Sequence, residues 1–224
     1  IERSITIKGL EAISDPTWSP NARYIAFSGM SNGISNLYLL DMVTKKVKQL
    51  TDDRFADFQA SWSPDGKTLA FVSDRGIKTD FNTLSYSLPQ ITLYDIASGN
   101  IRVLSLFENA RHINPQYSPD GKSIYFISDQ DGFIDVYREA LDSNKTYRVT
   151  KSYTGVSGIT ELSQAMSIAA KTGSMAYSVF EKNNFIIFTL DQSQINGTLI
   201  DKNMLVDSTN AAILPPVQRT KEKM

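Results

Sequence analysis

His112 is the only histidine of the sequence, and a serine nucleophile activated by a His and an acid would need it as the general base. The nearest approach to a G-x-S-x-G nucleophile elbow is residues 155–159, Gly-Val-Ser-Gly-Ile, which fails at the last position. We therefore expect His112 to be a hydrogen-bonding or solvated loop residue. The sequence predicts no catalytic residue within these 224 positions.

The sequence also lacks the residue patterns of common metal and cofactor sites. A zinc site needs clustered His or Cys ligands, and the chain has one His, no Cys and no H-E-x-x-H motif. Residues 129–132, Asp-Gln-Asp-Gly, resemble part of a calcium loop but lack the spaced oxygen ligands and the closing Glu. Neither Gly-rich phosphate fingerprint occurs. We expect no cofactor, with calcium at residues 129–132 as the minor alternative.

The charge balance excludes further classes of partner. The chain has 23 Lys and Arg against 24 Asp and Glu, so no basic field would draw it onto nucleic acid. No apolar run approaches the roughly 18 residues of a membrane span, so membrane insertion is not expected. The first residues, Ile-Glu-Arg-Ser, lack a signal-peptide pattern and an initiator Met, and we expect an upstream region to have been removed.

An internal repeat organises the chain. Residues 15–28, 60–73 and 115–128 each carry an aromatic residue, Ser-Pro, a turn and an alternating apolar strand, and a degenerate copy ends at Ser178. The aromatic markers of the second strand, Phe27, Phe71, Phe126 and Tyr177, are spaced by 44, 55 and 51 residues. This spacing is close to the roughly 40 to 50 residues of a propeller blade.

A second marker supports the same period. Each copy has a later strand with an aromatic residue near an Asp, at Tyr38, Tyr94, Tyr137 and Phe188. The distance between the two markers is 11, 23, 11 and 11 residues, so the second copy carries 12 extra residues. Each unit therefore reads as four short strands, which favours an all-β fold and a β-propeller built of four-stranded antiparallel blades.

Local turn chemistry agrees with this architecture. In Ser-Pro-Asp-Gly, Pro presets φ and Gly takes the left-handed position of a hairpin with a bulge. The first copy has Asn21-Ala22 in place of Asp-Gly, so either Asn21 or Ala22 must adopt a positive φ. The Trp and Tyr markers that precede Ser-Pro are expected in the core, because they recur at a structural spacing.

The repeated pattern Pro-x-Trp-Ser-Pro-Asp-Gly-Lys, followed by an apolar strand and a strand ending in Leu-Thr, resembles the WD40-like repeat of TolB-type β-propellers. Residues 15–150 carry three good copies, and residues 151–200 carry a degenerate fourth, because Leu-Ser-Gln-Ala-Met-Ser stands at 162–167 in place of Trp-Ser-Pro-Asp-Gly. The same repeat occurs in periplasmic Tol-system proteins, in tricorn-like proteases and in prolyl-oligopeptidase-type peptidases. The resemblance therefore implies a fold and does not fix a function.

Propellers of this family usually have six or more blades, which makes this chain a partial propeller of about four. Residues 1–14 are interpreted as the outer strand of a preceding blade, and the tail over 201–224 as a terminal strand or linker. The blades are expected over residues 15–58, 59–112, 113–160 and 161–200. Two explanations stay open, a truncated chain and a ring closed by strand exchange between the two chain ends.

The enlarged connections, residues 75–90 and 151–158, both fall on the face that carries the strand 2–3 loops and the blade-to-blade loops. Loops on a rigid scaffold carry function, so we expect this face to bind a partner. Aromatic and Arg residues are enriched at interaction hot spots. The expected contact residues are Arg54, Phe55, Arg75, Asp80, Phe81, Tyr86, Arg111, His112 and Tyr153.

The first functional hypothesis is a non-enzymatic module that binds a protein, a peptide or another domain of the same chain. The resemblance implies a periplasmic or cell-envelope location. The second hypothesis is the propeller of a larger hydrolase, such as a prolyl-oligopeptidase-like or tricorn-like peptidase, with catalytic residues outside this segment. A propeller lyase acting on acidic sugars is the weakest hypothesis, because metal-ligating His residues are lacking.

Overall fold

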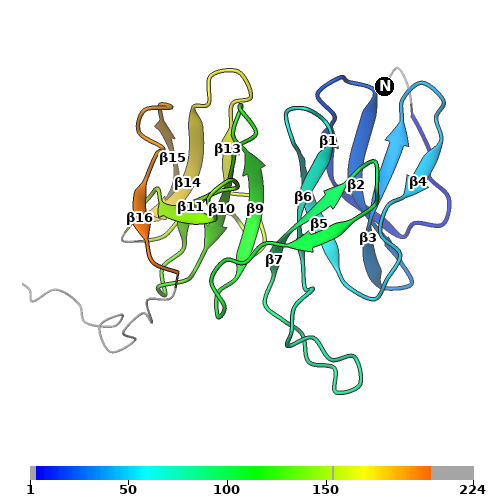
Figure 1. Cartoon of the computed structure of the whole chain (residues 1–224), viewed down its shortest axis with the longest axis horizontal. Helices are drawn as coiled ribbons and strands as arrows, with labels where there is room; N and C mark the ends of the chain where they lie inside the picture. The colour runs from blue at the N-terminus through cyan, green and yellow to red at the C-terminus, as the bar shows by residue number, and fades with distance from the viewer. Residues whose placement is uncertain (1–3, 153, 203–224) are drawn as a thin grey trace, which may run out of the picture.

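The computed structural model describes residues 4–152 and 154–202, and these residues form β-strands, turns and loops without a helix. None of this part of the chain could therefore cross a membrane as a helix. Four antiparallel sheets follow one another along the chain and form the blades of a propeller (Figure 1). The expected all-β fold and the propeller of four blades are confirmed.

Blades one and two each contain four strands in the order of the sequence. Blade one consists of β1 (Ala12–Trp18), β2 (Tyr24–Ser31), β3 (Ile34–Asp41) and β4 (Val47–Gln49). Blade two consists of β5 (Asp57–Trp62), β6 (Thr68–Ser73), β7 (Gln90–Asp95) and β8 (Ile101–Val103). β5 packs against β1, β2 and β3, so the first strand of blade two forms the contact between the two blades.

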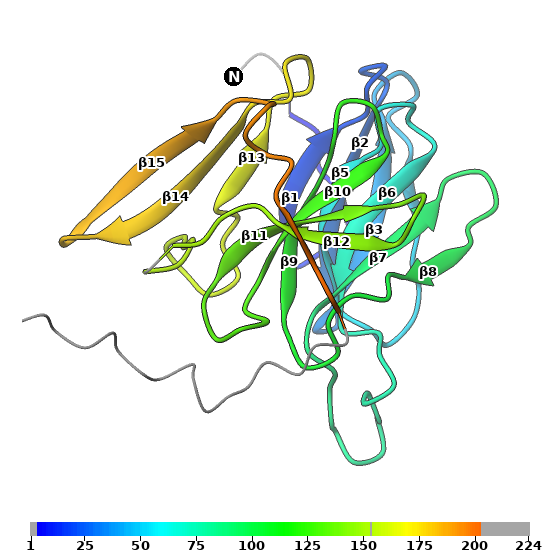
Figure 2. The ribbon, with the colours of Figure 1, turned by 60° about the vertical axis from the view of Figure 1, so that its left-hand side comes forward.

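Blades three and four differ from the simple meander. Blade three consists of β9 (His112–Tyr117), β10 (Ser123–Ser128), β11 (Asp135–Ala140) and β12 (Lys145–Arg148). Blade four contains three strands, β13 (Met166–Ile168), β14 (Met175–Glu181) and β15 (Asn184–Leu190). The last strand, β16 (Thr198–Ile200), pairs with β12 and extends blade three to five strands (Figure 2).

The strand register corrects one count made from the sequence. Phe27 lies opposite Tyr38, Phe126 opposite Tyr137 and Tyr177 opposite Phe188, each 11 positions apart. In blade two the partner of Phe71 is Thr92, 21 positions away, and Tyr94 pairs with Leu69 instead. Blade two therefore places a threonine where the others have an aromatic residue, and its connection is longer by ten residues rather than 12.

Apolar side chains pack between neighbouring blades. Trp62 and Tyr117, the residues before Ser-Pro in blades two and three, are each 8% exposed, and the Trp62 indole donates a hydrogen bond to the Thr17 carbonyl of blade one. The equivalent Trp18 of blade one is 54% exposed, so the expectation that all these markers lie in the core is wrong for Trp18. In the described structure no blade precedes blade one to cover it.

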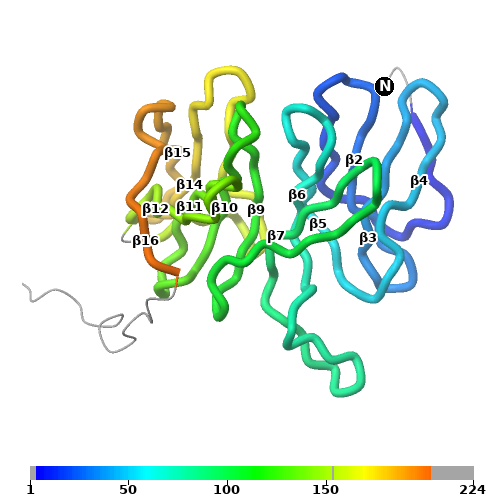
Figure 3. The backbone as a smooth tube through the Cα atoms, in the orientation of Figure 1, coloured from blue at the N-terminus to red at the C-terminus, as the bar shows by residue number. Residues whose placement is uncertain are grey.

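The outer strand of a preceding blade, expected within residues 1–14, is not formed over the described residues 4–11. Ile7 and Leu10 instead pack against Phe27, Tyr38 and Leu40 on the face of blade one that no other blade covers. The smooth backbone trace in Figure 3 shows this segment running alongside blade one. Burial of these aromatic rings by the segment removes apolar area from water and stabilises the first blade.

Side-chain hydrogen bonds link the innermost strands. Gln59 and Asn114 sit at bulges with φ of 54° and 56°, at the same position of their repeats. Gln59 Oε1 accepts a bond of 2.8 Å from the Asn114 N–H, and Asn114 Oδ1 accepts the N–H groups of Ala165 and Met166. A side chain of blade two thus binds the backbone of blade three, and a side chain of blade three binds the backbone at the start of blade four.

The first-copy hairpin adopts its positive φ at Ala22, at 54°, where blades two and three have Gly66 and Gly121 at 70°. A left-handed residue other than Gly costs roughly 1 to 2 kcal/mol, partly offset by the greater chain entropy of Gly when unfolded. We predict that Ala22→Gly raises the free energy of unfolding by about 0.5 to 1 kcal/mol. Urea denaturation would measure the change, and a loss of stability would contradict the assignment.

Candidate functional site

The enlarged loop of blade two, residues 74–89, projects beyond the sheets at the bottom of Figure 1. It has internal structure, because Asp80 and Ser85 form an antiparallel bridge. Thr79 Oγ1 donates to the Asp74 carbonyl at 2.6 Å and accepts the Ser87 N–H at 2.9 Å. These bonds hold the two sides of the loop together, so the loop has a defined conformation where it extends beyond the blade.

Phe81 and Tyr86 of this loop come together with Arg54 and Phe55 of the connection before β5, and we refer to these four residues as the arginine–aromatic cluster. The rings of Phe55 and Phe81 lie 5.2 Å apart, and those of Phe81 and Tyr86 lie 6.3 Å apart. The Arg54 guanidinium stands 4.3 Å from the centre of the Phe81 ring. Tyr86 is 56% exposed and Arg54 is exposed, so the cluster presents both a cation and apolar rings to solvent.

Arg75 lies between this cluster and the buried Asp57 of blade two. It is only 7% exposed and forms ion pairs with Asp53 and, at 2.5 Å, with the fully buried Asp57. Its guanidinium also lies 4.9 Å from the Phe55 ring. Burial raises the pKa of the Asp57 carboxyl to about 6, and the Arg75 charge opposes that rise, so Asp57 is ionised at neutral pH. Arg75 therefore joins the cluster to the core of blade two and offers little surface to a partner.

Arg111 and His112 lie apart from the cluster, in and beside the connection between blades two and three. Arg111 is half-buried and pairs with Asp129 at 3.5 Å and with Glu161 at 2.5 Å. His112 is fully buried, with Nδ1 3.1 Å from Ser128 Oγ and Nε2 3.0 Å from the Phe107 carbonyl. The sequence expectation of a loop His is therefore wrong, because His112 begins β9 inside the core.

The buried ring of His112 is held in its neutral form. Burial lowers its pKa to about 4, and the bond to the Phe107 carbonyl opposes this only in part. A neutral, enclosed imidazole cannot contact a partner in this conformation, so His112 is absent from the exposed surface. Asp80 is exposed and caps its own turn, since Oδ1 accepts the Asn82 N–H at 2.8 Å. Tyr153 lies outside the described residues.

The enlarged connections share one face, which we call the loop face. Lys78 Nζ, in the long loop of blade two, donates to Asn109 Oδ1 in the connection between blades two and three. The Val156 N–H, in the next connection, donates to the Ile134 carbonyl beside β11. These contacts, with the Arg111 pairs, bring strand 2–3 loops and blade-to-blade loops together as the alternation of the meander predicts.

Several exposed aliphatic residues of the loop face escaped the sequence analysis. Ile77 is fully exposed, Leu84 is 66% exposed and Leu88 is 48% exposed, and all three belong to the enlarged loop. A search confined to aromatic and Arg residues could not find them. Their signal was the density of apolar residues within a long loop, where polar turn residues are the usual choice.

The carboxylates of the Asp-rich loop after β10 form ion pairs with arginine side chains. Asp129 pairs with Arg111, and Asp131 Oδ2 lies 2.5 Å from Arg148. Arg148 also binds the buried Asp135, so these carboxylates hold loops to blade three. Among residues 4–152 and 154–202, no group of three His, Cys, Asp or Glu side chains is arranged to hold a metal ion.

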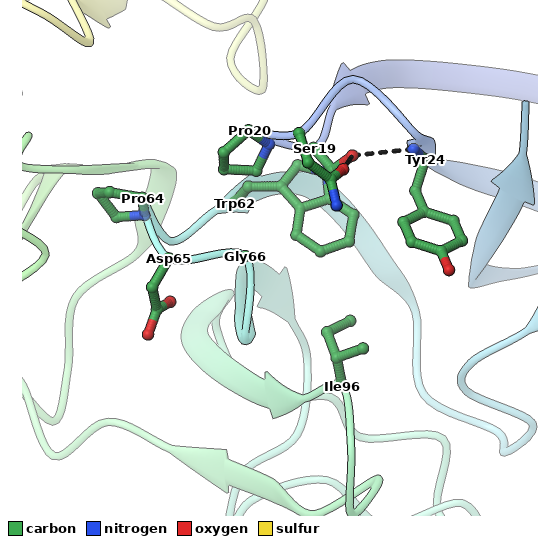
Figure 4. Close-up of a pocket in the computed structure, with 9 residues that line it drawn as sticks. Ser19, Pro20, Tyr24, Trp62, Pro64, Asp65, Gly66 and Ile96 are labelled. Atoms are coloured by element: carbon green, nitrogen blue, oxygen red, sulfur yellow. Dashed lines mark hydrogen bonds between the residues drawn. The ribbon is translucent and has the colours of Figure 1, made fainter.

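A first hollow, of about 340 Å³, lies between the Ser-Pro hairpins of blades one and two (Figure 4). Trp62, Tyr24 and Ile96 form its apolar walls. Its polar side chains are used by the turns themselves, because Ser19 Oγ accepts the Tyr24 N–H at 2.8 Å and donates to Asn21 Oδ1. This hollow is therefore the space left where the two hairpins pack together, and its polar groups are not free to bind a ligand. The second hollow, of about 390 Å³, lies between blades three and four.

Comparison with known proteins supports the repeat assignment. The family described as "TolB beta propeller domain" matches residues 3–86. A Tol-Pal system protein TolB of Francisella tularensis subsp. holarctica is 30% identical over 131 residues, which cover 58% of this chain and 28% of that protein. The chain therefore spans less than a third of the length of this curated relative.

Solved structures share the fold. TolB from Acinetobacter baumannii superposes with a TM-score of 0.66 at 21% identity, covering 84% of this chain and 42% of that one. A puromycin-hydrolyzing peptidase of Mycobacterium tuberculosis gives a TM-score of 0.62 at 15% identity, covering 86% of this chain and 31% of that one. Fold likeness at this identity carries no catalytic residue across. The matched repeat over residues 3–86, the sequence relatives and the blade geometry together show that this chain has a β-propeller fold similar to that of TolB.

Proposed function

We propose that the chain is a non-catalytic interaction module that binds a protein or peptide partner through the loop face. The observation that carries this proposal is the arginine–aromatic cluster, in which the enlarged strand 2–3 loop of blade two meets the connection before β5. A few residues supply most of the binding energy in protein interfaces, and Trp, Tyr and Arg are enriched among them. The rigid base formed by Arg75 and Asp57 reduces the entropy lost when a partner orders this surface.

The surface combines two kinds of contact. Exposed aliphatic groups at Ile77, Leu84 and Leu88 belong to the same loop as Phe81 and Tyr86, and Arg54 contributes a cation close to the Phe81 ring. Such a surface suits an apolar segment of a partner that carries a carboxylate to meet Arg54. The relatives named as Tol-Pal system proteins support a partner within that system and a place in the cell envelope or periplasm for this chain.

A second candidate function is the propeller of a larger hydrolase, favoured by the fold shared with the puromycin-hydrolyzing peptidase. In that arrangement the loop face would meet another domain of the same chain, and catalytic residues would lie outside these 224. The sequence of the complete gene would distinguish the two, since a G-x-S-x-G or H-E-x-x-H domain beside this segment supports the hydrolase.

We predict that the double substitution Phe81→Ala and Tyr86→Ala weakens partner binding at least tenfold while the fold is kept, because both rings are at least partly exposed. Purified Tol-Pal components would serve as the binding probes in surface plasmon resonance, with circular dichroism as the check of folding. The matched control is Phe180→Ala, which removes an exposed ring from blade four. Unchanged binding by the double variant would overturn the proposed surface.

A further inference from the structure

Blade four lacks the outer strand that completes the other blades. Its sheet ends at β15, whereas β3, β7 and β11 are each covered by a further strand. The segment that follows β15, β16, is paired with β12 instead. It is held there by an ion pair of 2.6 Å between Lys202 and Glu139 and by a bond from Arg138 Nε to the Asn196 carbonyl. The far edge of β15 therefore has no strand beside it within the described residues.

The repeat shows which backbone groups face that edge. Ile187 lies opposite Ser178, in the position that Leu37 and Val136 occupy in blades one and three. The Leu37 carbonyl accepts the Leu50 N–H at 2.8 Å, and the Val136 carbonyl accepts the Val149 N–H at 2.8 Å. The carbonyl of Ile187 is therefore directed at the open edge.

The N–H group at this position follows the same rule. The Leu37 N–H donates to Thr51 Oγ1 and the Val136 N–H donates to Thr150 Oγ1, both at 2.9 Å. Each threonine comes just after the outer strand of its blade. The open edge of blade four thus presents at Ile187 both groups that an outer strand and its closing threonine bind elsewhere in the chain.

The second hollow lies beside this edge. Tyr177, Val179, Phe188 and Leu190 of blade four line it, together with residues 149–152 and 154 and Glu181. In blade one, the residues equivalent to Phe188 and Leu190 pair with β4. A strand added to β15 in the same register would direct alternate side chains into this volume of about 390 Å³.

β15 also lacks the features that protect an exposed edge. Its seven residues contain no charged residue and no Pro, and Phe185 and Ile187 are 53% and 73% exposed. Edge strands are normally short, charged or interrupted by Pro, since an uncharged edge pairs readily with another strand. β4, β8 and β16 follow this rule, because each has only three residues.

We propose that the open edge of β15 binds an extended peptide segment of a partner protein as an antiparallel outer strand of blade four. The chain itself defines the chemistry of the ligand. Residues 47–51, Val-Lys-Gln-Leu-Thr, and 101–105, Ile-Arg-Val-Leu-Ser, share an apolar first residue, a cationic second, an aliphatic fourth and a hydroxyl at the fifth. Main-chain bonds would supply affinity, and the hollow would select the apolar side chains. This site is separate from the arginine–aromatic cluster, so either proposal can fail alone.

The test uses the full chain and a synthetic peptide with the sequence of residues 46–52, Lys-Val-Lys-Gln-Leu-Thr-Asp. Nitrogen-15 NMR titration is expected to shift the amide signals of β15 and to slow hydrogen exchange at the Ile187 amide. Ile187→Pro removes that edge N–H and should weaken binding at least tenfold, because Pro is tolerated at an edge that faces solvent. Ile187→Ala keeps the N–H and should stay within about threefold of the unchanged chain. A peptide with Val in place of Thr should bind at least threefold more weakly.

Three results would overturn the proposal. No shift of the β15 signals at millimolar peptide would mean that the edge does not accept a strand. An Ile187 amide protected in the free chain, and exposed when residues 203–224 are deleted, would assign the edge to the chain's own tail. A dimer in light scattering that Ile187→Pro converts to a monomer would assign it to a second copy. Binding of the Phe81→Ala and Tyr86→Ala variant to the peptide should equal that of the unchanged chain.

Discussion

Replacing Arg75 by Ala is expected to lower the free energy of unfolding by about 3 to 5 kcal/mol, the loss typical when one partner of a buried ion pair is removed. Asp57 is fully buried, and its Oδ2 atom has no hydrogen-bond partner even when Arg75 is present. Without Arg75 the carboxylate would keep its bond to Ser73 Oγ at 2.7 Å but would lose its cationic partner. Urea denaturation at pH 7 would measure the change.

The double variant Arg75→Ala and Asp57→Asn separates charge from packing. It leaves no unpaired ionised group buried at this site, so it should recover a substantial part of the stability lost by Arg75→Ala alone. A double variant as unstable as the single one would show that Arg75 acts by packing against Phe55 and Phe71, whose rings lie 4.9 and 5.8 Å from its guanidinium. The single variant should also lose the ordered base of the arginine–aromatic cluster, since the Arg75 guanidinium lies 4.9 Å from the Phe55 ring.

Acidification from pH 7 to pH 4 should cost the folded chain about 3 kcal/mol through His112 alone. Its pKa is about 4 in the folded chain and near 6.5 when exposed, so the unfolded chain takes up the proton first as the pH falls. The stabilisation is complete above pH 6.5 and disappears as the pH falls towards 4. Denaturation curves at pH 7, 6, 5 and 4 would follow the loss.

The control for this prediction must account for Asp57, whose pKa is raised to about 6. A carboxyl with a raised pKa contributes stability at low pH that disappears as the pH rises through about 6, so it opposes His112 over the same range. The comparison is therefore made between the unchanged chain and His112→Gln at each pH. The unchanged chain should lose about 3 kcal/mol more than the variant, and parallel curves would contradict a buried neutral His112.

The blade architecture could be predicted from sequence because it depends on a repeated local signal. Ser-Pro-Asp-Gly fixes a hairpin, and the aromatic markers recur at a blade period. The register of blade two was harder to predict from sequence. Tyr94 resembles the aromatic marker of the other blades, but Thr92 is the residue that pairs with Phe71. An alternating strand contains several candidate positions, and only pairing with Phe71 chooses between them.

The site could be predicted only in part. The sequence placed Arg54, Phe55, Phe81 and Tyr86 on one face because loop length and meander alternation depend on topology alone. Burial of Arg75 and His112 depends on long-range packing, which residue type cannot reveal. The missing strand of blade four depends on a competition between β12 and β15 for one segment, and local spacing alone would have assigned Thr198–Ile200 to β15.

Site-specific photo-cross-linking would test the loop-face proposal most directly. A photoreactive phenylalanine analogue would replace Tyr86 in the arginine–aromatic cluster or Val43, which is 75% exposed in the turn after β3. The account predicts that the probe at position 86 forms a covalent adduct with the partner and that the probe at position 43 forms none. Equal cross-linking at both positions, or cross-linking at 43 alone, would contradict it.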